Sequence, residues 1–383
     1  MHQAFRKASD PVIYLGKKRD DYFKTFQTFC QGATTVAIFA DFLASKLQTA
    51  IHQAVYTKVC LDIADLMQNN CQALNGNREK LEFHILKELA AKQNFQAFQM
   101  YINFPKQYFE EFITNSVYSY CKENDNLKTF LNTRLRGFQC LLLKAIATAT
   151  SKTKDIGGSV VMWLDEFCSQ LGGELQLGRQ ELKAVEHQEI KDIGFLTESV
   201  TKALENVVES LSKDFQKTSL KDIEHGMSNI IDILIEQLCG CWEKCPFCNA
   251  VCTNTIPGHD GDHSVPFHRP QAVTGTTWYK TNYLVTDICT SLVASDCSIV
   301  LSESNKIPYK RYRDAGIPYS QWSITADNSS LKYWQWYVAY FRENLESSYK
   351  SKFEGRGNIP DTWTKIKKEE ALSEIGKRLT SNS

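Results

Sequence analysis

The sequence predicts a mainly α-helical protein, with an elongated multi-helix body over residues 1–240 and a small α+β zinc-binding module over residues 241–383. Three observations lead to this prediction. In the first part, apolar residues recur every three or four positions, which is the period of a helix packed on one face. After residue 268, short segments rich in β-branched and aromatic residues favour strands. Between them, cysteines and histidines gather in one stretch, as in zinc sites.

The body is expected to consist of successive amphipathic helices. The first runs from Asp21 to about Asn70, with Gly32 as a candidate interruption. The turn Asn75-Gly76-Asn77 follows, and Asn77 can cap the next helix. Pro105 suits the first turn of another helix, which ends near Lys122. Further helices are expected over residues 127–152, 160–171, 197–215 and 223–238, the last preceded by a weak capping box at Ser219 and Asp222.

The last third of the chain combines short strands with helices. Residues 278–285 and 297–301 have the composition of strands. Residues 174–195 are more polar and are interpreted as a connection between helices of the body. Helical patterns return over residues 334–345 and 371–379, so we expect an α+β module rather than a continuation of the helical body.

Charge, cysteine content and the distribution of apolar residues indicate which classes of protein this chain can belong to. The 44 basic and 44 acidic side chains cancel, so the chain lacks the positive charge of a dedicated nucleic-acid binder. Thirteen cysteines could suggest a disulfide scaffold, but a chain of 383 residues is too long to need one. The eight cysteines outside the region 239–252 are scattered singly, as expected for reduced thiols. The first residues lack the apolar core of a signal peptide, and no long apolar run suggests a membrane span. We therefore expect a cytoplasmic or nuclear protein.

The Cys/His stretch extends from Cys245 to His268 with the spacing C-x2-C-x3-C-x6-H-x3-H-x4-H. Thiolate and imidazole groups are the preferred ligands of tetrahedral structural zinc. We predict one Zn²⁺ per chain, a structural ion, with the metal ligands Cys245, Cys248, His263 and His268. Cys252 and His259 are the alternates.

Other chemistries are less consistent with this stretch. A catalytic zinc would need an open coordination position and a base, for which Asp260 or Asp262 could serve; these carboxylates are better interpreted as partners of the imidazoles or as exposed turn residues. A zinc finger that recognises a nucleic-acid sequence does so with a helix. In this chain that helix would have to lie in a segment rich in proline and glycine, which disfavours it. The chain contains neither a P-loop pattern nor a G-x-S-x-G elbow. We therefore predict no catalytic residues and no GTP binding by this chain.

A family resemblance rests on the residues around this stretch. The runs 240–248 and 253–270 resemble the C-terminal region of the very large interferon-inducible GTPase family. Residues 29–33, 77–82 and 291–295 are also similar to that family. The resemblance implies a cytosolic, partly nuclear protein induced by interferon, with a guanine-nucleotide domain upstream of the matched region. It also implies that the family's Cys/His positions correspond to Cys245, Cys248, Cys252, His259, His263 and His268. The resemblance does not decide which four of these six residues bind the metal.

The resemblance implies a non-catalytic helical and zinc-binding portion of such a GTPase, acting in assembly or partner docking in cell-autonomous immune defence. Protein partners or self-association are expected, and nucleic acid is not. One alternative is a zinc-dependent ubiquitin-ligase-like module, which would need eight ligands for two ions and hence the help of Cys239 and Cys241. A second alternative is an RNA-binding zinc finger protein, whose affinity would fall steeply with salt.

Overall fold

The computed structural model describes residues 11–122, 126–175, 177–186, 188, 190–218, 224–326 and 331–380. The chain forms two compact units. The first comprises Met1–Leu61 and Cys121–Gly226, and the second comprises Asp62–Tyr120 and Met227–Ser383. The segment 62–120 thus belongs to the same unit as the Cys/His stretch, whereas the boundary at residue 240 stays a prediction.

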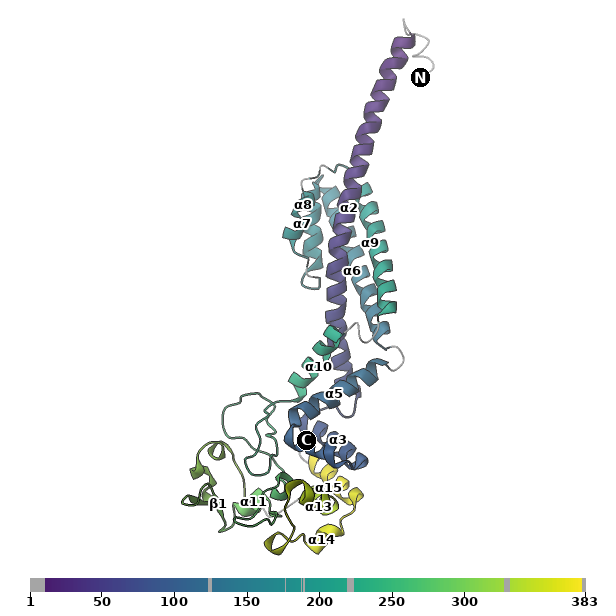
Figure 1. Ribbon diagram of the computed structural model, residues 1–383. Helices are drawn as coiled ribbons and strands as arrows, with labels where there is room; N and C mark the ends of the chain where they lie inside the picture. Colours follow the sequence, from purple (N-terminus) through teal and green to yellow (C-terminus); the bar gives the residue numbers. More distant parts are fainter. Residues whose placement is uncertain are drawn as a thin grey trace. The chain divides into compact units, whose positions relative to one another are not determined.

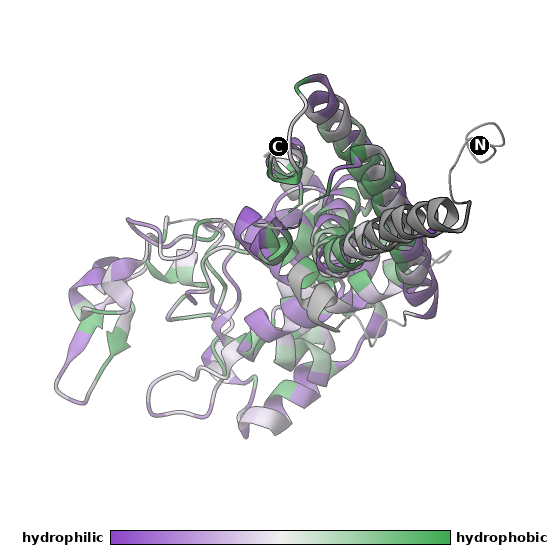
Figure 2. Cartoon of the chain, turned by 90° about the horizontal axis from the view of Figure 1, so that it is seen from above, coloured by the Kyte–Doolittle hydropathy of each residue, from purple (hydrophilic) through white to green (hydrophobic). Residues whose placement is uncertain are grey.

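The first unit is a bundle of helices, as the apolar periodicity predicts. In Figure 1 α6 (Asn126–Asp155), α7 (Val160–Leu171) and α9 (Ile193–Lys217) lie beside α2 (Pro11–Asn70), with the short η2 (Arg179–Leu182) and α8 (Lys183–Glu186) following α7. Each helix buries one stripe of apolar side chains, such as Leu43 and Leu47 of α2 and Leu142 of α6. Figure 2 colours these hydrophobic residues green. Helix-on-helix packing of these stripes therefore forms the core of this unit.

Two helix starts in this unit differ from their predictions. The first helix, α2, begins at Pro11, and Gly32 lies within it without interrupting it. Helix α9 begins four residues before Thr197, because the Asp192 carboxylate accepts a hydrogen bond from the Phe195 backbone N–H at 2.9 Å and caps the helix there. The capping box expected at Ser219 and Asp222 lies outside the described residues.

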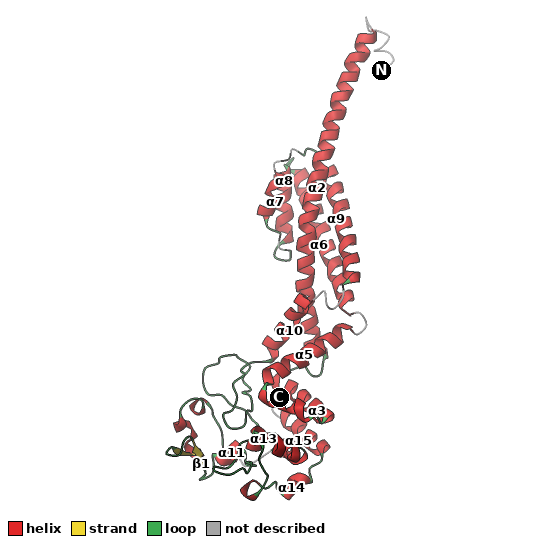
Figure 3. Ribbon diagram, in the orientation of Figure 1, coloured by secondary structure: helices red, strands yellow, loops and turns green. Residues whose placement is uncertain are grey.

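The second unit contains helices from two distant parts of the chain. Figure 3 shows that long loops make up most of residues 239–288 in this unit. The α-helices with residues in this unit, besides the end of α2, are α3 (Arg78–Lys92), α4 (Phe95–Asn103), α5 (Pro105–Lys122), α10 (Glu224–Leu238), α11 (Cys289–Leu292), α12 (Lys332–Tyr340), α13 (Arg342–Tyr349), α14 (Asp361–Thr364) and α15 (Lys368–Thr380). Helix α15 packs against α3 and α12. The buried Tyr333 hydroxyl donates to the Leu86 carbonyl oxygen at 2.7 Å and ties α12 to α3.

One two-stranded antiparallel sheet is found among the described residues. It pairs β1 (Ser298–Val300) with β2 (Lys306–Pro308), and Ile299 lies opposite Ile307. The strand predicted over residues 278–285 is replaced by a tight turn with an isolated bridge between Thr277 and Leu284. Lys280 has a φ of 57°, which breaks extended backbone. The described residues of this unit also form four short 3₁₀ helices: η3 (Gln271–Thr274), η4 (Tyr309–Ala315), η5 (Tyr319–Gln321) and η6 (Gly355–Gly357).

Among the described helices, none combines the length and the apolar composition that crossing a bilayer requires.

Asn77 caps α3 as the sequence predicts, because its side-chain oxygen accepts a hydrogen bond from the Lys80 N–H at 3.1 Å. We predict that Asn77→Ala lowers the free energy of unfolding by about 1 kcal/mol. Urea unfolding followed by tryptophan fluorescence measures the change. The control Asn77→Asp keeps an acceptor and should lose much less; equal losses in the two variants would contradict the capping role.

Candidate metal centre

The Cys/His stretch begins seven residues after the end of α10 at Leu238 and first forms a tight hairpin. Lys244 and Val251 pair in an antiparallel bridge, and the Cys245 N–H donates to the Ala250 carbonyl oxygen at 2.8 Å. Asn249 adopts a φ of 55°, a left-handed conformation that asparagine tolerates better than most residues. The turn directs the two cysteines of Cys-Pro-Phe-Cys to one point, which is what a shared ligand site needs.

The chain passes closely over itself beside this hairpin. The Cys241 N–H donates to the Asn254 carbonyl oxygen at 2.8 Å, and a Cβ atom on Gly240 would lie only 2.2 Å from the same oxygen. Gly258 and Gly261 have φ values of 63° and 90° in the loop that leads to His263. Glycine is therefore required here for close approach and for left-handed turns.

Four buried side chains converge in the Cys3His cluster, which comprises Cys245, Cys248, His268 and Cys289. The Cys248 Sγ lies 3.4 Å from the His268 Nδ1, and the Cys245 Sγ lies 4.0 Å from the Cys289 Sγ. Cys289 is the first residue of α11. This cluster therefore joins the hairpin to a helix more than forty residues later in the chain.

A second group, the Cys2His2 cluster, comprises Cys241, Cys252, His259 and His263. The Cys241 Sγ lies 3.5 Å from the His263 Nδ1, and the Cys252 Sγ lies 3.5 Å from the His259 Nε2. The two imidazole nitrogens are 3.1 Å apart. Both cysteines of this cluster are buried and both histidines are half-buried.

These distances fit the edges of a tetrahedron around an ion. With Zn–S near 2.3 Å and Zn–N near 2.05 Å, tetrahedral geometry requires separations of about 3.8 Å for S···S, 3.6 Å for S···N and 3.3 Å for N···N. The corresponding separations in the structure are 4.0 Å, 3.4–3.5 Å and 3.1 Å. Within each cluster all ligand atoms lie within 4.8 Å of one another. Both clusters could therefore hold a metal ion.

The surroundings of the Cys3His cluster are apolar. Its three cysteines belong to a hydrophobic core with residues such as Phe247, Tyr312 and Trp322. Burial raises the pKa of Cys245 and Cys289 well above the usual 9.0. Burial also acts on Cys248, but hydrogen bonds with Cys245 and Cys289 and the neighbouring His268 hold its pKa well below 9.0. A divalent cation among the sulfur atoms would remove the cost of ionising all three.

Backbone contacts fix the histidines of the Cys2His2 cluster. The His259 Nδ1 lies 3.2 Å from the Asp260 carbonyl oxygen, which can only accept, so Nδ1 carries the proton and Nε2 is free for a metal. The His263 N–H donates to the Gln321 carbonyl oxygen at 2.7 Å. The Asp260 and Asp262 carboxylates do not bond to the imidazoles: Asp262 accepts two hydrogen bonds from Arg313, at 2.6 and 2.9 Å, and Asp260 contributes only its carbonyl.

The structure thus divides the six sequence candidates between two clusters. It brings Cys245, Cys248 and His268 together, and it places His263 with the alternates Cys252 and His259. The predicted ligand set lacked two members, Cys241 and Cys289, although Cys241 was named as an added ligand in the ligase alternative. Cys241 had a signal, because it stands four residues before Cys245 in a cysteine-rich run. The sequence contains no such signal for Cys289, since only the fold brings this residue to the hairpin.

No helix lies between Cys248 and His268 in the structure. Residues 253–268 form turns, bends and isolated bridges, all of them described. The spacing of Cys245, Cys248, His263 and His268 resembles a nucleic-acid-binding finger, but the reading helix of such a finger is missing from this segment.

Known proteins are similar to this chain along nearly its whole length. Residues 241–375 match the family described as "Interferon-induced very large GTPase 1, C-terminal domain". The chain is 46% identical to mouse interferon-induced very large GTPase 1 over 379 residues, and 46% identical to the human protein of that name over 380 residues. These matches cover 98% and 99% of the chain but only 16% of each relative. No solved structure matches the chain.

The close approach at Gly240 generates a prediction. We expect Gly240→Ala to lower the free energy of unfolding by about 2 kcal/mol, because the new methyl group collides with backbone that cannot rotate away. The control Gly376→Ala adds a methyl group 3.6 Å from Phe83, an ordinary contact inside a helix, and should be neutral or stabilising. Urea unfolding of both variants measures the difference, and an unchanged Gly240→Ala protein would refute the close packing.

Proposed function

Because the chain belongs to the interferon-induced very large GTPase family, whose C-terminal domain it carries over residues 241–375, we propose that it is the non-catalytic, zinc-binding C-terminal portion of such a GTPase. It acts in assembly or partner docking in cell-autonomous immune defence, in the cytoplasm or nucleus. GTP binding belongs to an upstream domain, since the 383 residues of this chain hold no P-loop pattern. Its helical body transmits or receives the motion of that domain.

One observation carries the zinc assignment: eight thiol and imidazole side chains form two sets of four with tetrahedral spacing. Cys3His and Cys2His2 are ligand sets of structural zinc, whereas a catalytic zinc keeps one position open. Soft sulfur with imidazole in tetrahedral geometry favours zinc over magnesium or calcium. This proposal replaces the single ion expected from the sequence by two structural Zn²⁺ ions per chain.

The proposed role in docking or assembly is supported by the effect that two ions would have on the loops of the second unit. Residues 241–289 contain only short helical turns and isolated bridges, so neither a long helix nor a sheet holds their loops. Two ions would close these loops into a defined surface, as in other small zinc modules that fold on metal binding. A stable surface without catalytic groups is suited to binding another protein.

We predict two zinc ions per chain by elemental analysis of the purified protein. Cys241→Ser and Cys289→Ser should each lower the content to about one, because each removes one ligand of four from a different site. Cys239→Ser is the matched control: Cys239 is buried nearby but belongs to neither cluster, and zinc should stay at two.

Two results would contradict the assignment. One zinc ion in the unaltered chain would mean that only one cluster binds metal. An undiminished content in Cys289→Ser would remove this cysteine from the ligand set.

A second candidate function is the ubiquitin-ligase-like module, which one observation favours. Eight ligands for two ions are present, and the two sets alternate along the chain, as interleaved two-zinc modules require. They do not alternate in regular pairs, since Cys241 is followed by two ligands of the other cluster and then by three of its own. The docking function is therefore preferred.

An autoubiquitination assay with a panel of conjugating enzymes separates the two functions, with Cys248→Ser as the zinc-site control. The docking proposal predicts equal, background signals from the unaltered chain and from Cys248→Ser. A signal that disappears in Cys248→Ser would establish the ligase instead.

A further inference from the structure

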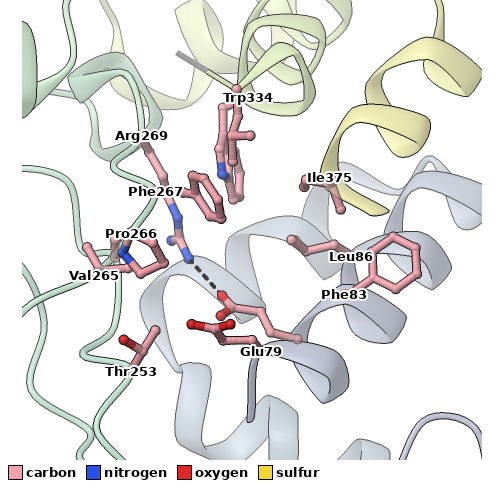
Figure 4. Close-up of a pocket in the computed structure, with 13 residues that line it drawn as sticks. Glu79, Phe83, Leu86, Thr253, Val265, Pro266, Phe267, Arg269, Trp334 and Ile375 are labelled. Atoms are coloured by element: carbon pink, nitrogen blue, oxygen red, sulfur yellow. Dashed lines mark ion pairs between the residues drawn. The ribbon is translucent and has the colours of Figure 1, made fainter. Parts of the chain in front are cut away.

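A cavity of about 40 Å³ lies in the second unit beside the metal clusters. Figure 4 shows that one wall is helix α3, which contributes Glu79, and the opposite wall is the segment 250–269, which contributes Arg269. Helices α12 and α15 complete it through Trp334 and Ile375. Four of the eight cluster residues lie within the segment 250–269, so the clusters position this wall.

The charges of the cavity leave one carboxylate uncompensated. Arg269 lies 3.8 Å from the Glu82 carboxylate, which also accepts a hydrogen bond from the Tyr101 hydroxyl. For Glu79, by contrast, no hydrogen bond or ion pair is found in the part of the chain that the structure describes. Burial, and then the charge of Glu82, raise the pKa of Glu79. The half-buried Glu79 therefore lacks the cation that a desolvated carboxylate needs.

A second, independent polar group in the cavity lacks a partner. Arg269 is only 2% exposed, and its guanidinium group lies against the rings of Trp334 and Tyr101, at 4.5 and 5.0 Å. Its Nη2 donates to the Tyr101 hydroxyl, whereas its Nη1 has no hydrogen-bond acceptor among the described residues. Buried donors without acceptors are rare in folded proteins. The cavity thus has a free anion at Glu79, beside a buried guanidinium whose Nη1 has no acceptor.

The remaining walls are apolar and the space is small. Phe83, Val265 and Phe267 line the cavity with the rings and aliphatic groups that cover a methylene chain. A volume of about 40 Å³ holds roughly three water-sized groups. A compact ammonium group with its nearest methylenes fits this space, whereas the wider planar guanidinium group of arginine does not.

We infer that this cavity binds the end of a lysine side chain of a partner protein, with the ammonium group on Glu79. The inference rests on the proposed docking function and names the chemistry of the partner. The metal clusters prepare the site because they fix the wall that carries Arg269.

The probe is Nα-acetyl-lysine N-methylamide, titrated into the zinc-loaded chain while the indole N–H signals of the tryptophans are followed by NMR. The Trp334 signal, assigned with Trp334→Phe, should shift with a dissociation constant on the order of 1 mM. Glu79→Gln should weaken binding about tenfold, because it removes the charge that holds the ammonium group. The matched control Glu88→Gln, on α3 but outside the cavity, should bind as the unaltered chain does.

Three comparison compounds identify the occupant. The norleucine analogue lacks the ammonium group and should cause no shift. Equal binding of the arginine analogue would overturn the size argument, and tighter binding of alanine N-methylamide would identify a protein N-terminus instead of lysine. If the chain holds two zinc ions but the lysine compound leaves Trp334 unchanged, this inference is wrong while the zinc module stands. A chain without zinc would refute the proposed function itself.

Discussion

The loops of the second unit would depend on one geometric requirement, that four ligands surround each of two metal ions. The ligands of the two clusters alternate along the chain, so each ion would close a loop that contains ligands of the other. One closure joins Cys241 to His263, and the other joins Cys245 to Cys289. Because the intervening segment has little regular secondary structure, these closures would fix its backbone in place of helical or sheet hydrogen bonds.

The clusters are joined to the helices of the same unit by a buried arginine. The Arg78 guanidinium donates to the Cys241 carbonyl oxygen and lies 4.3 Å from the Trp242 ring. Arg78 is the first residue of α3, one position before Glu79. The backbone at the Cys2His2 cluster is therefore coupled directly to the helix that forms the opposite wall of the cavity. Metal binding at this cluster would consequently be linked to the shape of the cavity by short contacts.

Sequence reasoning predicted the helices well because their signals are local. The stripe through Leu43 and Leu47, the cap at Asn77 and the proline at 105 each act within a few residues of the chain. The short segment 278–285 was predicted incorrectly because its composition favours strands, whereas the left-handed Lys280 and the turn after Trp278 determine its conformation.

Some candidate metal ligands can likewise be identified from local sequence, whereas others depend on the fold. The turn Cys-Pro-Phe-Cys identifies Cys245 and Cys248 from spacing alone, but spacing cannot decide which of two interleaved sets a histidine joins. His263 lies with Cys241 because its backbone pairs with residues 321 and 323, a contact between distant segments. Cys289 enters its cluster through the placement of α11. Long-range packing, which the sequence does not display locally, therefore selects the ligand sets.

X-ray absorption at the zinc edge of the purified chain tests the two-ion account most directly. Five sulfur and three nitrogen donors shared by two ions predict an average shell of about 2.5 sulfur atoms near 2.3 Å and 1.5 nitrogen atoms near 2.0 Å per zinc. An average of two sulfur and two nitrogen atoms, with one ion per chain, would contradict the two interleaved sites, and a shell without sulfur would contradict both clusters.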